Sequence, residues 1–240
     1  MGSNLKNMEK IKKILANYSL SEEIVQLLSG IDLVLFVGIT SSGKNTVMNE
    51  LLGDRNYKRV VSDTTRDPRP GEVNGVDYWF KSEQEFLEGL ESGSYIEAAV
   101  VHNRQLSGLH SSEFKNNMDG YGKFINEVDV RGVDTFKQVK PDTTTIFVIP
   151  PSFEVWKQRL LDRGQMDDTE LRSRLISAHN ELLTAVKTTY YHFLVNDNLE
   201  KAVSGAQKII NGEIDTRHEE YGRRLALELL EQIDKFSTLA

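Results

Sequence analysis

The stretch LVLFVGITSSGKNTVMNELL, residues 33–52, decides the fold that the sequence predicts. Its first part, LVLFVG, is an apolar run typical of a buried strand. Its middle has the spacing G-x-x-x-x-G-K of a phosphate-binding loop, and its last part begins a helix whose Val47, Leu51 and Leu52 can face a sheet. In this order, backbone N–H groups and a helix N-terminus surround phosphate oxygens, and Lys44 adds a positive charge. The stretch therefore predicts a nucleotide-phosphate site.

A second polar segment follows, SDTTRDPRPGEVNGVDYWF at residues 62–80. Arg66 and Arg69 lie three positions apart within it, and Tyr78 follows a glycine-rich turn. A guanidinium group can form two charge-assisted hydrogen bonds to a phosphate monoester. The two arginines are therefore candidates for holding the phosphate of an acceptor molecule.

Short apolar runs separated by helical stretches continue along the chain. They are YKRVVS (57–62), FINEVDV (124–130), TTIFVIP (144–150) and HFLVN (192–196). Such alternation predicts an α/β fold in which a parallel sheet is flanked by helices. Apolar residues at helical spacing also predict amphipathic helices in residues 1–30 and from about 216 to 236, as extensions that could pack on the domain or join two copies in a homodimer.

Composition excludes several classes of function. The 240 residues carry a net charge of −7, which argues against broad binding of nucleic acid. The chain has no cysteine, so disulfides and thiolate chemistry are excluded. No apolar run is long enough to cross a membrane, and the N-terminus lacks the apolar core of a signal peptide. We expect a cytoplasmic protein that does not bind membranes.

These motifs resemble the signature of guanylate kinases, the nucleoside monophosphate kinases that transfer a phosphoryl group from ATP to GMP. The resemblance covers roughly residues 31–212 and includes INEVDVRGV (125–133), FVIPPSFEVWKQRLLDRG (147–164) and FLVNDNLEKAV (193–203). It implies an inserted subdomain for the nucleoside monophosphate at about 62–123 and a lid at about 163–175. Residues 1–30 and 213–240 would then be helical extensions at the two ends.

The resemblance also implies a role for each matching residue. The ATP-binding residues would be Gly38, Ser41, Ser42, Gly43, Lys44, Asn45, Thr46, Arg159 and Arg163. The GMP-binding residues would be Ser62, Arg66, Arg69, Tyr78, Glu97, Glu127 and Asp129. Catalysis would rest on Lys44, Arg66, Asp129, Arg163 and Arg174.

Two carboxylate predictions depend on chemistry as well as on the resemblance. Glu97 would accept hydrogen bonds from the guanine N1 and N2 donors, since a carboxylate offers only acceptors. Glu127 and Asp129 lie two apart on a predicted strand and should point to the same side, near guanine and the metal. A structural salt bridge is the alternative for this pair.

One position of the phosphate loop departs from the usual pattern. A hydroxyl normally follows the lysine and reaches Mg²⁺, but this chain has Asn45 there, followed by Thr46. Adenylate kinases also place a threonine two positions after the lysine, and Mg²⁺ can be held through water and substrate oxygens. We expect Mg²⁺ to bind with ATP, with Thr46 and more weakly Asn45 as contacts.

The second departure concerns the acceptor. The family's Tyr-Gly-Thr loop, which contacts the GMP phosphate and guanine, aligns with Ser107, Gly108 and Leu109. Phosphorylation of GMP and dGMP is the leading prediction. Two alternatives remain: the same fold with another acceptor, such as a different or modified nucleotide or ribose 1,5-bisphosphate, and a catalytically silent binding module. The presence of Gly38, Gly43 and Lys44 argues against the silent binding module.

Overall fold

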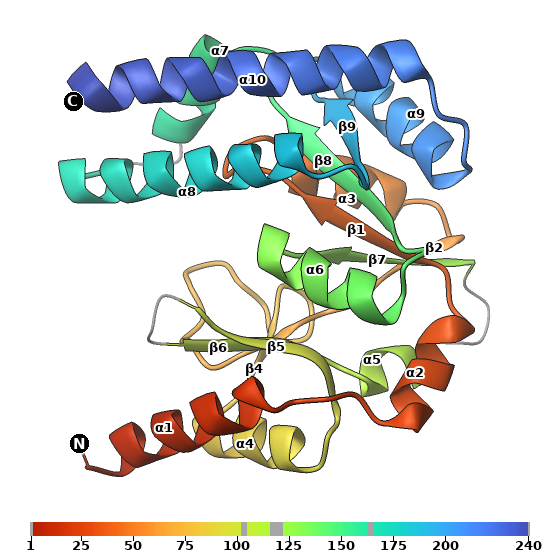
Figure 1. The fold of residues 1–240 in the computed structure, drawn as a ribbon, viewed down its shortest axis with the longest axis vertical. Coiled ribbons are helices and arrows are strands. Elements are labelled where there is room, and N and C mark those ends of the chain that lie inside the picture. Colours follow the sequence, from red (N-terminus) through yellow and green to blue (C-terminus); the bar gives the residue numbers. More distant parts are fainter. Residues whose placement is uncertain (1, 102–104, 116–121, 163–165, 240) are drawn as a thin grey trace. The chain divides into compact units, whose positions relative to one another are not determined.

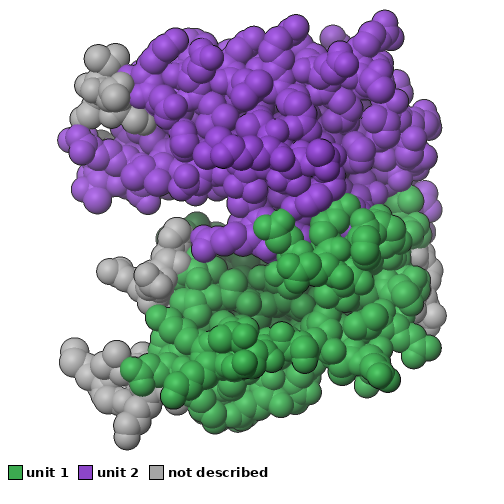
Figure 2. All heavy atoms as spheres, viewed as in Figure 1, with its two compact units in different colours: residues 1–32, 58–126, 134–142 green, residues 33–57, 127–133, 143–240 purple. Residues whose placement is uncertain are grey.

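The structure is a computed structural model that describes residues 2–101, 105–115, 122–162 and 166–239. Backbone contacts divide the chain into two compact units, coloured separately in Figure 2. Unit 1 comprises residues 1–32, 58–126 and 134–142. Unit 2 comprises residues 33–57, 127–133 and 143–240.

The larger sheet has five strands in the order β2-β7-β1-β8-β9. Their bounds are Leu33–Val37 for β1, Tyr57–Arg59 for β2, Lys123–Glu127 for β7, Thr144–Ile149 for β8 and Tyr191–Val195 for β9. The pairs β1·β8 and β8·β9 are parallel, and all five residues of β1 are buried. The predicted α/β fold with a parallel sheet is confirmed, because strands covered on both faces read as continuous apolar runs.

The helices of unit 2 pack on the strands of the same unit and on one another (Figure 1). Their bounds are α3 Lys44–Leu51, α7 Phe153–Leu161, α8 Asp168–Lys187, α9 Leu199–Ile210 and α10 Thr216–Leu239. The predicted C-terminal helix is thus present, and its Leu225, Leu229 and Ile233 are buried where it packs on α8 and β9. No helix in the described ranges is both long and apolar enough to span a membrane.

Unit 1 contains a mixed sheet of four strands in the order β4-β3-β6-β5. The strands are β3 Asp63–Thr64, β4 Trp79–Phe80, β5 Tyr95–Val101 and β6 Gln105–His110. The helices that begin in this unit's segments are α1 Gly2–Ala16, α2 Glu22–Ser29, α4 Glu83–Glu91 and α5 Ser112–Lys115. The predicted helices near the N-terminus are confirmed, and Ile11 of α1 is fully buried against α4 and β5.

One strand ends earlier than the sequence predicts. β7 stops at Glu127, and Asp129 lies just before helix α6, Val130–Val139. The Asp129 carboxylate accepts a hydrogen bond from the Gly132 N–H at 2.8 Å, as aspartates do at helix N-termini. The prediction that Glu127 and Asp129 share one strand is therefore wrong, since the preference of Asp129 for a helix start overrides the apolar run around it.

Gly38, at the end of β1, can be tested for its effect on stability. Its φ is +147°, and a Cβ built there would lie 2.3 Å from the backbone oxygen of Val148. The main chain at Val148 cannot move away as the end of a flexible side chain can. We therefore expect Gly38→Ala to lower the free energy of unfolding by about 2–4 kcal/mol. Urea unfolding measures this change.

Gly212→Ala is the matched control for Gly38→Ala. Gly212 also has a positive φ, +77°, but a Cβ there meets no atom within 4 Å. We expect it to lose only about 1 kcal/mol, from the left-handed backbone alone. Equal losses at the two glycines would contradict the importance of the close approach at Gly38.

Candidate active site

The phosphate loop joins β1 to α3 in unit 2, as the sequence predicts. Its backbone enters the left-handed region at Ser41, with φ of +62°, and at Gly43, with φ of +87°. Gly43 is the N-cap of α3, so Lys44 is the first residue of the helix. Alternation of right- and left-handed residues directs successive N–H groups to one side, where they bind anions. The loop is therefore built to hold phosphate oxygens.

Two buried serine hydroxyls of the loop have no hydrogen-bond partner in the part of the chain that the structure describes. Ser42 is 0% exposed and Ser41 is 8% exposed, and neither Oγ has a hydrogen-bond partner among the described residues. Buried polar groups are nearly always hydrogen-bonded, so such atoms require an explanation. Oxygen atoms of a bound nucleotide would supply the missing partners.

Three side chains hold the backbone carbonyl groups of the loop. The Trp156 indole N–H donates to the Thr40 carbonyl at 2.8 Å, and the Asn196 amide donates to the Ser42 carbonyl at 3.0 Å. Arg159 donates to the carbonyls of Ser42 at 3.4 Å and Asn196 at 3.1 Å. Fixing carbonyl oxygens in this way also fixes the peptide planes, and with them the directions of the N–H groups.

The sequence predicted Arg159 at the ATP site but did not single out Trp156 and Asn196. Both occur in segments that carry the family resemblance, FVIPPSFEVWKQRLLDRG and FLVNDNLEKAV. No local pattern predicts these contacts, because Trp156 and Thr40 are 116 positions apart and Asn196 and Ser42 are 154 apart.

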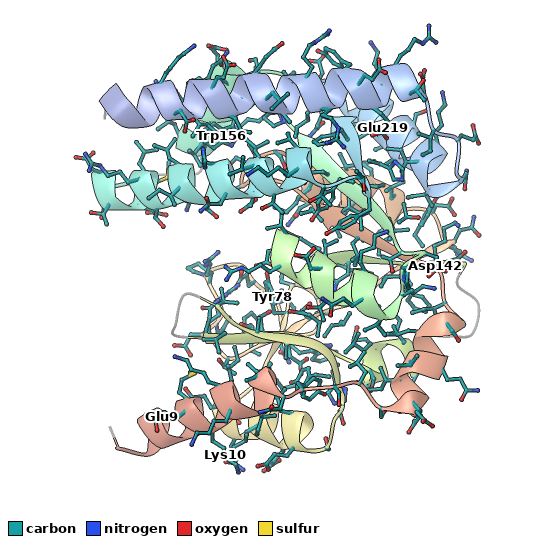
Figure 3. All side chains as sticks on the ribbon, viewed as in Figure 1. Glu9, Lys10, Tyr78, Asp142, Trp156 and Glu219 are labelled. Carbon is teal, nitrogen blue, oxygen red and sulfur yellow. The ribbon has the colours of Figure 1, made fainter. Side chains whose placement is uncertain are left out.

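Trp156, labelled in Figure 3, offers a test of this support. We expect Trp156→Phe to raise the KM for ATP about three- to tenfold, the effect of one lost hydrogen bond, because the bond from the Trp156 indole N–H to the Thr40 carbonyl is removed. Steady-state kinetics with varied ATP measures it. Trp79→Phe is a matched control, since Trp79 also donates its indole N–H, to Glu113 in unit 1 at 2.8 Å. An equal rise in both variants would contradict a specific role for Trp156.

Charged side chains from three segments of unit 2 lie near the lysine of the loop. The Lys44 ammonium is 3.1 Å from a Glu127 carboxylate oxygen, and both side chains are largely buried. Burial raises the pKa of Glu181 on α8, whereas the charge of Lys44 lowers it. The negative charges of Asp129 and Glu127 also raise the pKa of Glu181. The sequence predicted three of these four groups and missed Glu181, which resembles any polar residue on a helix.

The donor set is compatible with Mg²⁺. Asn45 and Thr46 are exposed on the first turn of α3, and Glu127 and Asp129 add carboxylates. All four offer oxygen atoms, the ligands that Mg²⁺ prefers. Within the described ranges, no group of three or more His, Cys, Asp or Glu side chains could hold a metal by itself. Nucleotide oxygens and water would therefore complete the coordination.

Arg66 in unit 1 forms a bidentate ion pair with Glu72, which the sequence did not predict. Its two terminal nitrogens each donate to an oxygen of Glu72 at 2.6 Å. The guanidinium of Arg66 holds the pKa of Glu72 down at about 2. The Glu72 carboxylate also accepts the Arg69 N–H at 2.7 Å, so it ties together the segment carrying both arginines. Glu72 lies within the segment 62–80 quoted above, but the sequence does not show that it pairs with Arg66, because that contact depends on the conformation of the loop between them.

Tyr78 lies beside Arg66. The guanidinium carbon is 4.9 Å from the centre of the Tyr78 ring, which Figure 3 labels, and 5.5 Å from that of Phe80. The structure thus brings together Arg66 and Tyr78, two of the predicted contacts to the acceptor phosphate. The Arg69 side chain is exposed. Stacking on aromatic rings restricts a guanidinium group to one plane, which favours paired hydrogen bonds to a phosphate.

Two further predicted acceptor residues, Ser62 and Glu97, lie beside or within the four-stranded sheet. Ser62 lies just before β3, and Glu97 is on β5. Strand β6, between β3 and β5, carries the residues that the sequence comparison predicts to replace the Tyr-Gly-Thr loop. Ser107 faces Ala99 and Thr64 across the sheet, and Gly108 faces Ala98 and Asp63. The predicted departure from the Tyr-Gly-Thr loop therefore falls on a strand between the segments of Ser62 and Glu97.

Two predicted catalytic arginines, Arg163 and Arg174, lie in the segment 163–175 that the sequence predicts as a lid. Arg174 on α8 forms an ion pair with Glu170, one helical turn away. Arg163 lies outside the described residues. The structure therefore gives a partner for Arg174, in an arrangement that stabilises a helix slightly whether or not a nucleotide is bound.

Comparison with known proteins gives consistent matches. A model of the guanylate kinase family matches residues 31–213. The chain is 36% identical over 182 residues to the guanylate kinase of Corynebacterium efficiens, covering 75% of this chain and 95% of that protein. It is 35% identical over 181 residues to that of Clostridium tetani, covering 75% and 86%.

A solved structure resembles this one as well. The crystal structure of guanylate kinase from Anaplasma phagocytophilum superposes with a TM-score of 0.59 at 30% sequence identity. The match covers 77% of this chain and 86% of that chain. Helices α1, α2 and α10 lie outside the residues that the family model matches.

Proposed function

Because the chain belongs to the guanylate kinase family of nucleoside monophosphate kinases, we propose that it transfers the γ-phosphoryl group of ATP to GMP and dGMP. The observation that carries this proposal is the phosphate loop. Ser41 and Gly43 of this loop have a left-handed backbone, the buried hydroxyls of Ser41 and Ser42 have no hydrogen-bond partner in the described part of the chain, and Lys44 begins α3. These features support binding of phosphate at the loop. A silent binding module has no need of such a site.

The donor half of the mechanism rests on unit 2. Loop N–H groups would bind the phosphates of ATP, and Lys44 would exchange part of its pairing with Glu127 for the outer phosphates. Phosphoryl transfer requires alignment and neutralisation of charge more than covalent chemistry. Mg²⁺, held through nucleotide oxygens with Asn45 and Thr46 nearby, would neutralise charge on those phosphates. We propose that Arg159 acts mainly by fixing the loop, because its guanidinium donates to the loop carbonyl of Ser42 and to the carbonyl of Asn196, whose side chain also holds Ser42.

The acceptor half rests on unit 1. Arg66, with Tyr78 and Arg69, would hold the phosphate of GMP, and Glu97 and Ser62 would contact guanine. Glu72 keeps the Arg66 guanidinium oriented, because its carboxylate binds both terminal nitrogens. A phosphate would compete with that carboxylate for the same fork. Residues 62–123 would thus be the acceptor-binding insert, and residues 163–175, with Arg163 and Arg174, the lid.

A nucleotide panel tests the proposal. Release of ADP would be followed with ATP and Mg²⁺ against GMP, dGMP, AMP, CMP, UMP, dTMP and ribose 1,5-bisphosphate, and then with Mn²⁺. We expect turnover with GMP and dGMP alone. Turnover only with another acceptor would overturn the assignment of GMP, and nucleotide binding without any turnover would favour the silent module.

The altered residues of β6 favour ribose 1,5-bisphosphate or a modified nucleotide as the second candidate acceptor. Ser107 and Leu109 replace two side chains that contact GMP in the family pattern, and loss of a contact to a base edge weakens discrimination. The same panel separates the two candidates, since a changed acceptor would give a higher kcat/KM than GMP under identical donor conditions.

A further inference from the structure

The N-terminal extension is an integral part of unit 1. Helix α1 and Tyr18 precede the region that the family model matches, which begins at residue 31. Ile11 nevertheless belongs to a buried cluster with Phe86, Leu87 and Leu90 of α4 and with Tyr95 and Leu106. Figure 1 shows α1 beside α4. The extension therefore packs against α4 and against β5, the strand that carries Glu97.

The Tyr18 side chain forms hydrogen bonds to both backbone polar groups of Tyr95 on β5. Its hydroxyl donates to the Tyr95 carbonyl at 2.8 Å and accepts the Tyr95 N–H at 3.0 Å. β5 is the edge strand of the four-stranded sheet among the described residues, so one of its sides has no neighbouring strand there. At Tyr95, the Tyr18 hydroxyl therefore replaces the two backbone hydrogen bonds that a neighbouring strand would form. Burial raises the pKa of this hydroxyl.

The contact lies at an irregularity in β5. Tyr95 pairs with His110 and Glu97 pairs with the adjacent Leu109, so Ile96 is an extra residue and forms a β-bulge. A bulge changes the direction of the side chains that follow it. Glu97, the proposed contact to guanine, is the first paired residue after this bulge. The direction of its carboxylate therefore depends on how firmly Tyr95 is held.

Tyr95 is also fixed at its far end. Its hydroxyl donates to Asp63 at 2.6 Å, and its ring stacks on Phe86 with 4.3 Å between centroids. Asp63, which is 3% exposed, directly follows Ser62, the other proposed contact to guanine. Tyr95 thus connects β5, which carries Glu97, to Asp63, the neighbour of Ser62, and Tyr18 holds the Tyr95 backbone.

We propose that Tyr18 is a positioning residue for recognition of the acceptor base: it fixes the β5 bulge so that Glu97 presents its carboxylate to the guanine N1 and N2 donors. The proposal rests on the proposed function. It gives the N-terminal extension a role in specificity that the family-matched region alone does not contain.

The test uses Tyr18→Phe in the full chain, which keeps the ring and removes the hydroxyl. We expect the KM for GMP to rise about tenfold, as for one or two lost hydrogen bonds, with the KM for ATP unchanged. The preference for GMP over IMP, which lacks the 2-amino group, should fall by a similar factor. Tyr221→Phe, an exposed tyrosine of α10, is the matched control and should change neither value.

A double variant separates positioning from general loosening. Glu97→Gln should itself reduce the preference for GMP over IMP, and Tyr18→Phe added to it should reduce that preference no further if Tyr18 acts through Glu97. Amide hydrogen exchange at Tyr95 and Glu97 should accelerate in Tyr18→Phe. Faster exchange with unchanged GMP kinetics would overturn the proposal and leave Tyr18 a merely structural residue.

The outcomes also separate this inference from the proposed function. A wild-type protein that phosphorylates another acceptor but not GMP would overturn both. A wild-type protein that phosphorylates GMP, together with a Tyr18→Phe variant of unchanged KM and unchanged preference, would overturn the inference alone. Additive losses in the double variant would also overturn it, because Tyr18 would then act independently of Glu97.

Discussion

Replacement of Lys44 by alanine is expected to lower kcat roughly 100- to 1000-fold, the usual effect of removing one group that stabilises charge in a transition state. Lys44 is the only residue of the loop whose side chain carries a positive charge, and it lies at the N-terminus of α3. Loop N–H groups would remain, so ATP should still bind, though more weakly. Single-turnover measurements at saturating ATP separate the chemical step from binding.

Lys201→Ala serves as the control for Lys44→Ala. Lys201 is an exposed lysine of α9 in the same unit, so its loss changes net charge equally without touching the loop. We expect normal turnover from it. Because Lys44→Ala leaves Glu127 without its ion-pair partner, a modest fall in stability should accompany the loss of activity. A folded Lys44→Ala variant with near-normal turnover would contradict the kinase assignment.

Replacement of Arg66 by alanine is expected to lower kcat/KM for GMP by roughly 100- to 1000-fold, with the affinity for ATP preserved. Arg66 is the best-defined of the proposed phosphate contacts, because Glu72, Tyr78 and Phe80 restrict its guanidinium to one orientation. Kinetics with varied GMP at saturating ATP, together with calorimetry of ATP binding, would measure the two effects separately.

Arg66→Lys tests the geometry of the guanidinium rather than its charge. A lysine keeps the positive charge but cannot form the paired hydrogen bonds of the fork, so we expect it to recover only a small part of the lost activity. Full activity in Arg66→Lys would contradict the two-pronged contact. An equal loss of ATP affinity in Arg66→Ala would contradict its assignment to the acceptor.

The Arg66 pair also predicts a dependence on pH. Glu72 has a folded-state pKa of about 2, below its ordinary value, because Arg66 binds its charged form. The contribution of this pair is therefore present above the ordinary carboxyl range and is lost as the pH falls through it toward 2. Thermal unfolding of Glu72→Gln should depend less on pH between about 5 and 2 than that of the wild type.

The sequence by itself determined the elements whose signals are local. An apolar run before a glycine-rich loop predicts β1, the phosphate loop and α3, because burial and backbone conformation are written in neighbouring residues. The same holds for the helices near both ends of the chain. The prediction failed at Asp129, where a strand and a helix start compete for one short segment.

Only the tertiary structure decided which distant side chains support the site. Trp156, Asn196, Glu181 and Tyr18 are ordinary residues in the sequence, and Glu72 is one carboxylate among many. Each gains its role from a contact with another part of the fold, such as the bond from Tyr18 to Tyr95, 77 positions along the chain. Hydrogen bonds need atoms within about 3 Å, and such proximity is fixed by how the chain returns on itself rather than by any local pattern.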